Sequence, residues 1–185
     1  MNTSHYYTEI VKELSLAADL ISDQEAEMLV DEILKAKKIF VAGAGRSGLM
    51  GKSFAMRMMH MGLDSYVIGE TVTPNLTEDD LIIFGSGSGE TKSLISMAEK
   101  AKSIDGKVIA VTIFPDSTLG KLADVCVKLP GSPKDQSEND YKTIQPMGSL
   151  FEQTLLLFFD AVILRFMERK GLDTDTMFGR HANLE

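Results

Sequence analysis

Short, continuously apolar runs alternate along the chain with segments in which apolar residues recur at helical spacing. The runs are rich in β-branched residues and lie at residues 39–41, 66–68, 81–84, 107–112 and 125–129. Runs of this kind are typical of parallel strands that are covered on both faces. Strands that alternate with helices indicate a parallel sheet with right-handed crossovers. We therefore predict an α/β fold, a three-layer α/β/α sandwich with a five-stranded parallel sheet.

Helical segments precede, separate and follow these runs. We predict helices at about residues 3–20, 22–36, 47–61, 91–104 and 149–170. The second helix opens with a capping signature, Ser22 followed by Glu25, and Gly171 closes the last one. The polar stretch 131–142 contains Gly and Pro and predicts a loop. We expect a single domain over residues 1–185, with extra N-terminal helices and a long C-terminal helix.

Length and composition favour a globular chain. Of the 185 residues, 44% are hydrophobic, which is enough for a core and unlike a disordered segment. The longest apolar run, 155–164, is interrupted by Asp160 and followed by Arg165, so it falls short of a membrane span. The N-terminus has neither the basic leader nor the apolar segment of a secretion signal, so we expect a cytoplasmic protein. The single cysteine, Cys126, is interpreted as a core residue.

The charge balance limits the expected partners. The chain has 19 Lys and Arg residues against 27 Asp and Glu residues, a formal net charge of -8, and no predicted helix carries a basic stripe. We therefore expect neither nucleic acid nor an anionic membrane as a partner. An anionic small molecule would need a local site of oriented N–H groups and one or two cations, because the overall field repels it.

Two glycine-rich loops occupy the same context, directly after a predicted strand and at the start of a predicted helix. They read GAGRSG at 43–48 and GSGSGET at 85–91. A helix N-terminus offers unpaired N–H groups and partial positive charge, and glycine lets an anion approach the backbone closely. The two loops therefore predict a phosphate cradle. The second loop supplies hydroxyl and backbone donors as candidate substrate-binding residues: Ser86, Gly87, Ser88, Gly89 and Thr91.

Two alternatives stay open for these loops. Each could be a glycine turn with a Ser or Thr helix cap, although a pair of them favours a ligand site, because ligands of open α/β sheets gather at the carboxyl ends of the strands. GAGRSG also matches the dinucleotide-binding fingerprint, with Glu70 near the place of the ribose-binding acid. Against this second alternative, the chain leaves no room for a separate substrate domain, and GSGSGET has no part in dinucleotide binding.

The same segments resemble a known family. Paired loops of the form GxGRSG and GSGSGET on a five-stranded parallel sheet are similar to the sugar isomerase (SIS) domain, a flavodoxin/Rossmann-like fold whose second loop binds the phosphate of a phosphosugar. Longer segments narrow the resemblance to the 6-phospho-3-hexuloisomerase family: AGAGRSGLMGKSFAMRMMHMG, GSGSGETKSL, PGSPKDQS, IQPMGSLFEQTLLLF and the HANLE tail. The stretch QPMGSLFEQ is the most specific of them.

The resemblance implies an isomerase that converts 3-hexulose 6-phosphate to fructose 6-phosphate through an enediol, as part of the ribulose monophosphate pathway of formaldehyde assimilation or detoxification. It implies that neither a metal nor an organic cofactor is used. It also implies a homo-oligomer, a dimer or a tetramer, and a functional link to 3-hexulose-6-phosphate synthase.

Glu152 is the candidate for the base that moves the proton. It lies one turn into the last predicted helix and is followed by an almost wholly apolar sequence, so its carboxylate should lie near the core and be less hydrated than a surface acid. The competing interpretation is structural, because Ser149 and Glu152 have the spacing of a capping box. The resemblance implies that a Glu in this segment is the proton acceptor.

Two cations and one serine complete the predicted substrate contacts. The resemblance implies that Ser47 contacts the substrate, and Arg46 beside the cradle could hold phosphate or sugar oxygens. Alternatively, Arg46 could form an ion pair with Glu70 or Glu90. Lys134 in the polar loop is a further candidate that could equally be a solvated charge. We expect the Glu90 carboxylate to point away from the cradle and bond to backbone, because it would repel phosphate.

Histidines are candidates for a second acid or base. His60, on the polar face of the first crossover helix, and His181, in the HANLE tail, could each supply a proton during ring opening, and related isomerases suggest that one could come from a neighbouring subunit. Each alone is more often structural. His5 falls in a segment expected to be frayed.

Apolar residues beyond the needs of one small sheet indicate self-association. They form one stripe on the first predicted helix and a methionine cluster on the first crossover helix, and they predict a symmetric oligomer. The stripe comprises Ile10, Leu14, Ala17 and Ile21, and the cluster comprises Met50, Met56, Met58, Met59 and Met61.

Two other functions remain possible within the same resemblance. One is a different phosphosugar isomerase, such as one for arabinose 5-phosphate, although those chains commonly carry added nucleotide-binding repeats that this length does not accommodate. The other is a phosphosugar sensor that binds without turnover, although the sequence contains no helix-turn-helix segment of a transcriptional version.

Overall fold

The computed structural model of the chain describes residues 2–132 and 142–184. The helices are α1 (Thr3–Ala18), α2 (Asp23–Lys35), α3 (Gly45–His60), α4 (Lys92–Lys102), α5 (Thr118–Leu122), α6 (Ser149–Lys170) and α7 (Thr174–Phe178). The strands are β1 (Ile39–Gly43), β2 (Ser65–Val67), β3 (Leu81–Gly85), β4 (Lys107–Thr112) and β5 (Val125–Lys128). Most of the loop predicted at 131–142 lies outside the described residues.

All five predicted strands are present and form one parallel sheet in the order β2-β1-β3-β4-β5. This confirms the predicted fold class. The boundaries differ by a residue or two: β2 begins at Ser65, and β1 and β3 continue into Gly43 and Gly85. The short helices α5 and α7 were not predicted, because five residues carry too little periodicity to be recognised.

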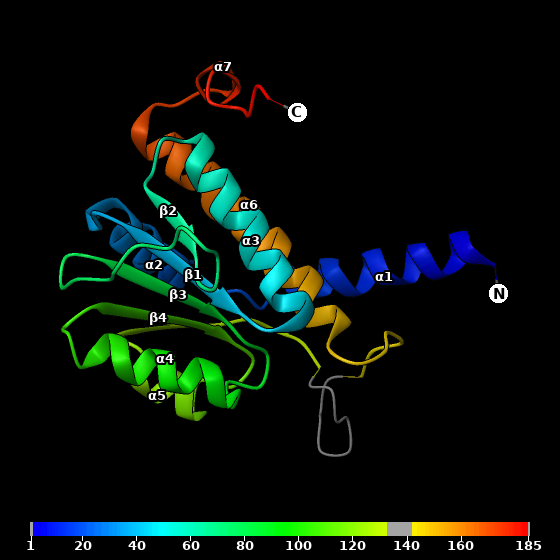
Figure 1. Cartoon of the computed structure of the whole chain (residues 1–185). Helices are drawn as coiled ribbons and strands as arrows, with labels where there is room; N and C mark the ends of the chain where they lie inside the picture. The colour runs from blue at the N-terminus through cyan, green and yellow to red at the C-terminus, as the bar shows by residue number, and fades with distance from the viewer. Residues whose placement is uncertain (1, 133–141, 185) are drawn as a thin grey trace.

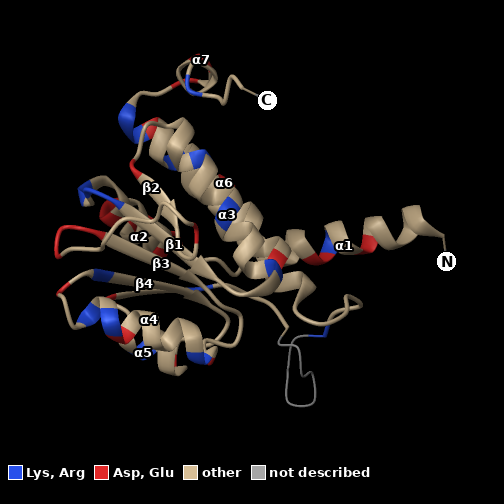
Figure 2. Ribbon diagram, in the orientation of Figure 1, with Lys and Arg blue, Asp and Glu red and all other residues tan. Residues whose placement is uncertain are grey.

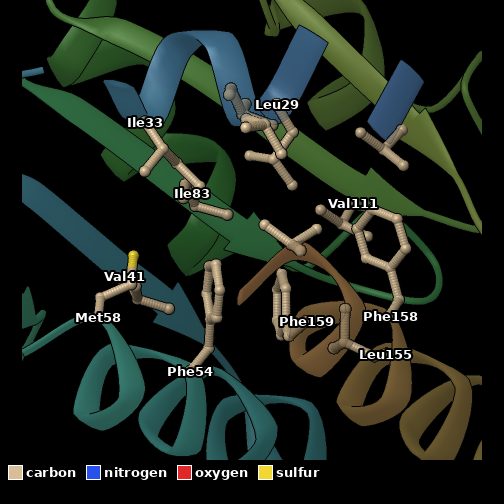
Figure 3. Close-up of a cluster of buried hydrophobic side chains, with 14 of the residues drawn as sticks. Leu29, Ile33, Val41, Phe54, Met58, Ile83, Val111, Leu155, Phe158 and Phe159 are labelled. Atoms are coloured by element: carbon tan, nitrogen blue, oxygen red, sulfur yellow. The ribbon is translucent and has the colours of Figure 1, made fainter. Parts of the chain in front are cut away.

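Helices cover both faces of the sheet and make three layers (Figure 1). One face packs against α2, α3 and α6, and the other packs against α4 and α5. Successive strand residues point to opposite faces, so Val41 belongs to the first cluster and its neighbour Phe40 to the second. Between α3 and α6, the rings of Phe54 and Phe159 stack with centroids 4.1 Å apart (Figure 3). This contact holds the two helices side by side.

Local signals account for several helix ends. The Ser22 hydroxyl accepts a hydrogen bond from the Glu25 amide at 3.3 Å, as the capping signature predicted. The Glu25 carboxylate does not close the box, because it accepts a bond from the amide of Lys128 in β5. Gly171 ends α6 in the left-handed conformation, with φ 63°.

Helix α1 projects from the body of the molecule, and Figure 1 shows its N-terminal half without a neighbouring element. Asn2 caps the helix by accepting a bond from the amide of His5, so the expectation of a frayed start was wrong. The side chains of Tyr6, Tyr7 and Val11 are 48%, 70% and 47% exposed, which is unusual for apolar residues on a single helix.

Figure 2 shows Lys and Arg residues interspersed with Asp and Glu along the helices of residues 2–132 and 142–184. Over residues 2–132 and 142–184, no helix combines the length and the apolar character needed to cross a membrane. Cys126 is half-buried, and burial raises the pKa of its thiol to about 11, so it stays protonated and packs as an apolar side chain.

Candidate active site

The two glycine loops meet at one point on the carboxyl edge of the sheet. Strands β1 and β3 are neighbours, and Gly43 pairs with Gly85 in their register. From β1 the chain crosses through α3 to β2 on one side, whereas from β3 it crosses through α4 to β4 on the other. Strand order therefore reverses between these two loops, and such switch points are where open α/β sheets bind their ligands.

A cavity of about 340 Å³ opens between the two loops and the start of α6. Its lining combines hydroxyls, glycine backbone, three apolar side chains and one carboxylate: Ala44, Ser47, Gly85, Ser86, Gly87, Ser88, Thr91, Ile113, Ser132, Gly148, Phe151 and Glu152. The structure thus brings together Ser47, Glu152 and the predicted residues of the second loop except Gly89, which is not among the lining residues. Sequence reasoning missed Ser132 and Gly148, although both lie in the quoted segments PGSPKDQS and QPMGSLFEQ.

Two glycines are required by close approach or by backbone conformation. A Cβ on Gly48 would lie 2.6 Å from the carbonyl oxygen of Gly43, so only glycine lets α3 start directly above β1. Gly89 has φ 64° and faces the side chain of Ser117, which leaves no space for a Cβ. The shape of both loops therefore depends on glycine.

The hydroxyls of the second loop are arranged around the start of α4. Ser86 is buried and accepts a bond from the Gly89 amide at 3.2 Å, which fixes the turn. Ser88 is exposed and accepts a bond from the Glu90 amide at 3.2 Å. Thr91 occupies the N-cap position, but its side chain makes no capping bond. The alternative of a plain Thr helix cap is therefore wrong.

Glu90 points away from the cavity, as expected. Its two carboxylate oxygens accept bonds from the amide and the hydroxyl of Thr118, at 2.7 and 2.9 Å. The amide bond, followed by the hydroxyl bond, lowers the pKa of Glu90. The Glu90 carboxylate links the second glycine loop to α5, with its charge directed away from the cavity.

Glu152 and Arg46 form the charged part of the site. Arg46 Nη1 lies 2.9 Å from Glu152 Oε2 and also donates to the Ser149 hydroxyl at 2.9 Å. The Glu152 side chain is only 9% exposed, whereas that of Arg46 is 53% exposed. The alternative pairing of Arg46 with Glu70 or Glu90 is therefore wrong.

The capping-box interpretation of Ser149 and Glu152 is also wrong. Gly148 is the N-cap of α6, without a side-chain capping bond, and Ser149 is already the first helical residue. The Ser149 hydroxyl is engaged by Arg46 instead. Glu152 is thus held by a residue of the first glycine loop and faces the cavity, where its carboxylate can exchange a proton with a bound molecule.

The two candidate histidines lie together, far from this cavity. The rings of His60 and His181 stack with centroids 5.2 Å apart. His60 ends α3, whereas the cavity lies at the start of that helix, about 22 Å away at 1.5 Å per residue. His60 shares its face of α3 with Arg57, as predicted, at 3.4 Å from Arg57 Nη1, but it is buried there. Burial, followed by the charges of Arg57 and His181, lowers its pKa.

Lys134 lies outside the described residues. Among the described residues, no group of three or more His, Cys, Asp or Glu side chains is placed to hold a metal ion.

Comparison with known proteins shows a family match over the segments that form the cavity. The family model for the SIS domain matches residues 32–157, which include both glycine loops and the start of α6. A Bacillus subtilis protein named 3-hexulose-6-phosphate isomerase is 64% identical over 185 residues, which is 100% of both chains. A Methanocaldococcus jannaschii protein of the same name is 44% identical over 158 residues, 85% of this chain and 83% of that one.

A solved structure supports the fold over nearly the full length. A hypothetical protein from Methanococcus jannaschii, whose crystal structure infers a molecular function of 3-hexulose-6-phosphate isomerase, has a TM-score of 0.84 and 38% sequence identity. The match covers 98% of this chain and 99% of that one.

Proposed function

This chain belongs to the SIS domain family, and we propose that it isomerises 3-hexulose 6-phosphate to fructose 6-phosphate. The observation that carries the proposal is the placement of Glu152 in a cavity whose other walls are the hydroxyl-rich loop and Ser47. A phosphosugar needs an anion cradle and a base within reach of its carbon chain, and the cavity offers both. The name of the Bacillus subtilis relative, identical at 64% of positions, supports the choice of substrate.

We assign the proton transfer to Glu152. Moving the carbonyl from carbon 3 to carbon 2 requires a base that removes the proton from carbon 2 and returns it to carbon 3 through an enediol, while the two oxygens exchange a proton. Glu152 is nearly buried, faces the cavity and is fixed by Arg46 and the first turn of α6. Because the carboxylate is nearly buried, little water can compete for the proton that it takes from the substrate.

Arg46 is proposed to hold oxygens of the substrate. Its guanidinium is half exposed and already lies at the start of α3, where the helix N-terminus favours an anion. Because one nitrogen serves both Ser149 and Glu152, its remaining N–H groups are available to a phosphate or a sugar oxygen. Lys134 stays a proposed contact, since it lies outside the described residues.

Substitutions in the cradle should weaken phosphosugar binding. Ser88→Ala and Thr91→Ala each remove a hydroxyl that lines the cavity, and we expect each to weaken binding by about 1–3 kcal/mol through lost charge-assisted bonds. Calorimetric titration with fructose 6-phosphate measures the change. Ser103→Ala is a matched control, because this hydroxyl lies at the opposite end of α4 and bonds to the Lys100 carbonyl. Unchanged affinity in both cradle variants would argue against a phosphate site there.

The chain is proposed to act as a homo-oligomer whose contacts include α1. Beside the exposed apolar side chains of α1 lies an open groove of about 660 Å³ between α1, α2 and α6, lined mainly by apolar residues such as Leu14, Ile21 and Phe158. A second copy of the chain fits this surface, because each copy would supply both an apolar helix and an apolar groove.

Light scattering of the full chain should therefore give the mass of a dimer or a tetramer at micromolar concentration. The charged substitution Tyr7→Glu should shift this mass toward the monomer, whereas the exposed Lys12→Glu, on the same helix, should shift it much less. A monomeric wild-type protein would contradict the proposal. It would also remove any role for His60 or His181 in the site of a neighbouring subunit, the one way in which these distant residues could reach a cavity of this kind.

Experiment distinguishes this isomerase from two other functions. A related isomerase would act on arabinose 5-phosphate, and a sensor would bind phosphosugars without turnover. The cavity itself is compatible with both, because the cradle recognises phosphate whatever sugar carries it.

A further inference from the structure

The Glu13 side chain joins helix α1 to the chain segment that leads into the active site. Its Oε2 accepts hydrogen bonds from the Thr143 hydroxyl at 2.6 Å and from Gln145 Nε2 at 2.9 Å. Its Oε1 accepts a bond from the Ile144 amide at 2.8 Å. One carboxylate thus binds three consecutive residues that lie about 130 positions later in the sequence.

The environment of Glu13 keeps it charged. Burial is the largest single influence and would raise the pKa of Glu13, but the bonds from Thr143, Gln145 and Ile144 together outweigh it and hold the pKa below its usual value. The three bonds are therefore charge-assisted, which makes them stronger than bonds between neutral groups. The other acid nearby on α1, Glu9, differs, because it pairs with Lys12 on its own helix, at 2.6 Å.

The segment held by Glu13 runs directly into the turn before α6. In that turn Met147 has φ 58°, a left-handed conformation that is unfavourable for a residue with a Cβ, and the Ser149 amide bonds to the Pro146 carbonyl. A strained turn persists only where its surroundings fix it. Here Glu13 fixes the chain before the turn, and Arg46 fixes Ser149 and Glu152 after it.

We propose that Glu13 is a positioning residue of the active site: it anchors the chain ahead of the turn and so sets the direction in which Glu152 enters the cavity. Glu13 is not among the residues that line the cavity, so it acts through the segment from Thr143 to Gly148. The inference rests on the proposed role of Glu152. It gives α1, which lies outside the sheet and its covering helices, a function in catalysis.

The test compares Glu13→Ala with Glu9→Ala, which removes a carboxylate one turn away on the same helix. We expect Glu13→Ala to lower kcat by about 10- to 100-fold, because small displacements of a catalytic group have effects of this order. The affinity for inorganic phosphate should stay within about twofold, because the cradle belongs to the loop between β3 and α4. Glu9→Ala should leave both quantities unchanged. Glu13→Gln keeps the side-chain length and one carbonyl oxygen, so its kcat should lie between those of Glu13→Ala and Glu9→Ala.

Hydrogen exchange of the full chain gives a readout that does not depend on turnover. In the wild type the Ile144 amide should be protected by its bond to Glu13, and Glu13→Ala should remove this protection while Glu9→Ala keeps it. If Glu13→Ala proves unstable, Glu13→Gln should still show a partial loss of protection at the Ile144 amide. Unchanged kcat, or equal losses of kcat and phosphate affinity, would overturn the inference. An inactive wild-type chain would refute the proposed isomerase, whereas unchanged exchange at Ile144 would refute the anchoring by Glu13.

Discussion

Glu152→Gln should lower kcat by roughly two to four orders of magnitude while KM changes little. Glutamine has the same length as glutamate, and its carbonyl oxygen can still accept the bond from Arg46 Nη1, so the start of α6 should keep its structure. It cannot take up the proton from carbon 2. Steady-state kinetics with 3-hexulose 6-phosphate separate the two parameters.

Asp160→Asn is the control for this substitution, because Asp160 is an exposed acid two turns further along α6. It should leave kcat within about twofold, as expected for a surface change away from the site. A Glu152→Gln variant that retained most of its turnover would place the base elsewhere, and His181 or His60 would be the next residue to replace.

Asp80→Ala should cost about 2–4 kcal/mol of unfolding free energy and leave catalysis at low temperature largely intact. Asp80 is 1% exposed and accepts bonds from the Thr77 amide and hydroxyl and from the Lys38 amide, with Lys38 Nζ 3.1 Å away. Removing it leaves several donors without their partner. It lies directly before β3, at the edge of the sheet opposite the cavity, so urea unfolding should change and kcat should not.

Asp79→Ala provides the matched control, because the Asp79 pair with Lys37 is exposed on both sides and should contribute less than about 1 kcal/mol. Similar losses for the two variants would contradict the assignment of Asp80 as a structural anchor.

Acid should lower the unfolding free energy of the wild type through the carboxylate of Asp80. Burial alone would raise the pKa of Asp80, but the bonds from Thr77 and Lys38 outweigh it and lower the pKa. A lowered folded-state pKa means that the contribution of Asp80 is complete above the pKa of an unfolded aspartate. It is lost as the pH falls through the folded-state value. Asp80→Ala should therefore reduce the dependence of stability on pH in this acid range.

The sheet and its longer covering helices could be predicted from the sequence because their signals are local, whereas the short helix α5 could not. Each buried strand is a short apolar run, and each crossover helix repeats its apolar residues at helical spacing. The strand ends were harder to predict, since Gly43 and Gly85 carry no apolar signal but pair with each other in the register. Glycine at these positions belongs to the strand and to the following glycine loop at once.

The place of the second glycine loop beside the cavity was predictable for the same reason, whereas the contact between Arg46 and Glu152 was not. GSGSGET follows a buried strand and opens a helix, so its chemistry can be inferred from neighbours in sequence. The contact between Arg46 and Ser149 joins residues 103 positions apart. The local spacing of Ser149 and Glu152 favoured a capping box, and the tertiary contact with Arg46 overrode that preference.

The surroundings of the histidines could not be predicted either, because they depend on tertiary contacts. Helical spacing placed His60 on a polar face of α3, but the C-terminal segment folds over the end of that helix and covers it with His181. Glu13 carried no signal of its own, because an acid on an exposed helix is common. Its role depends on a segment that only the folded chain brings near.

The central claim is tested most directly by incubating the purified full chain with 3-hexulose 6-phosphate and following the appearance of fructose 6-phosphate, with the Glu152→Gln variant in parallel. The proposed function predicts rapid formation of fructose 6-phosphate by the wild type and almost none by the variant. Binding of the substrate without turnover, or turnover of arabinose 5-phosphate alone, would contradict it.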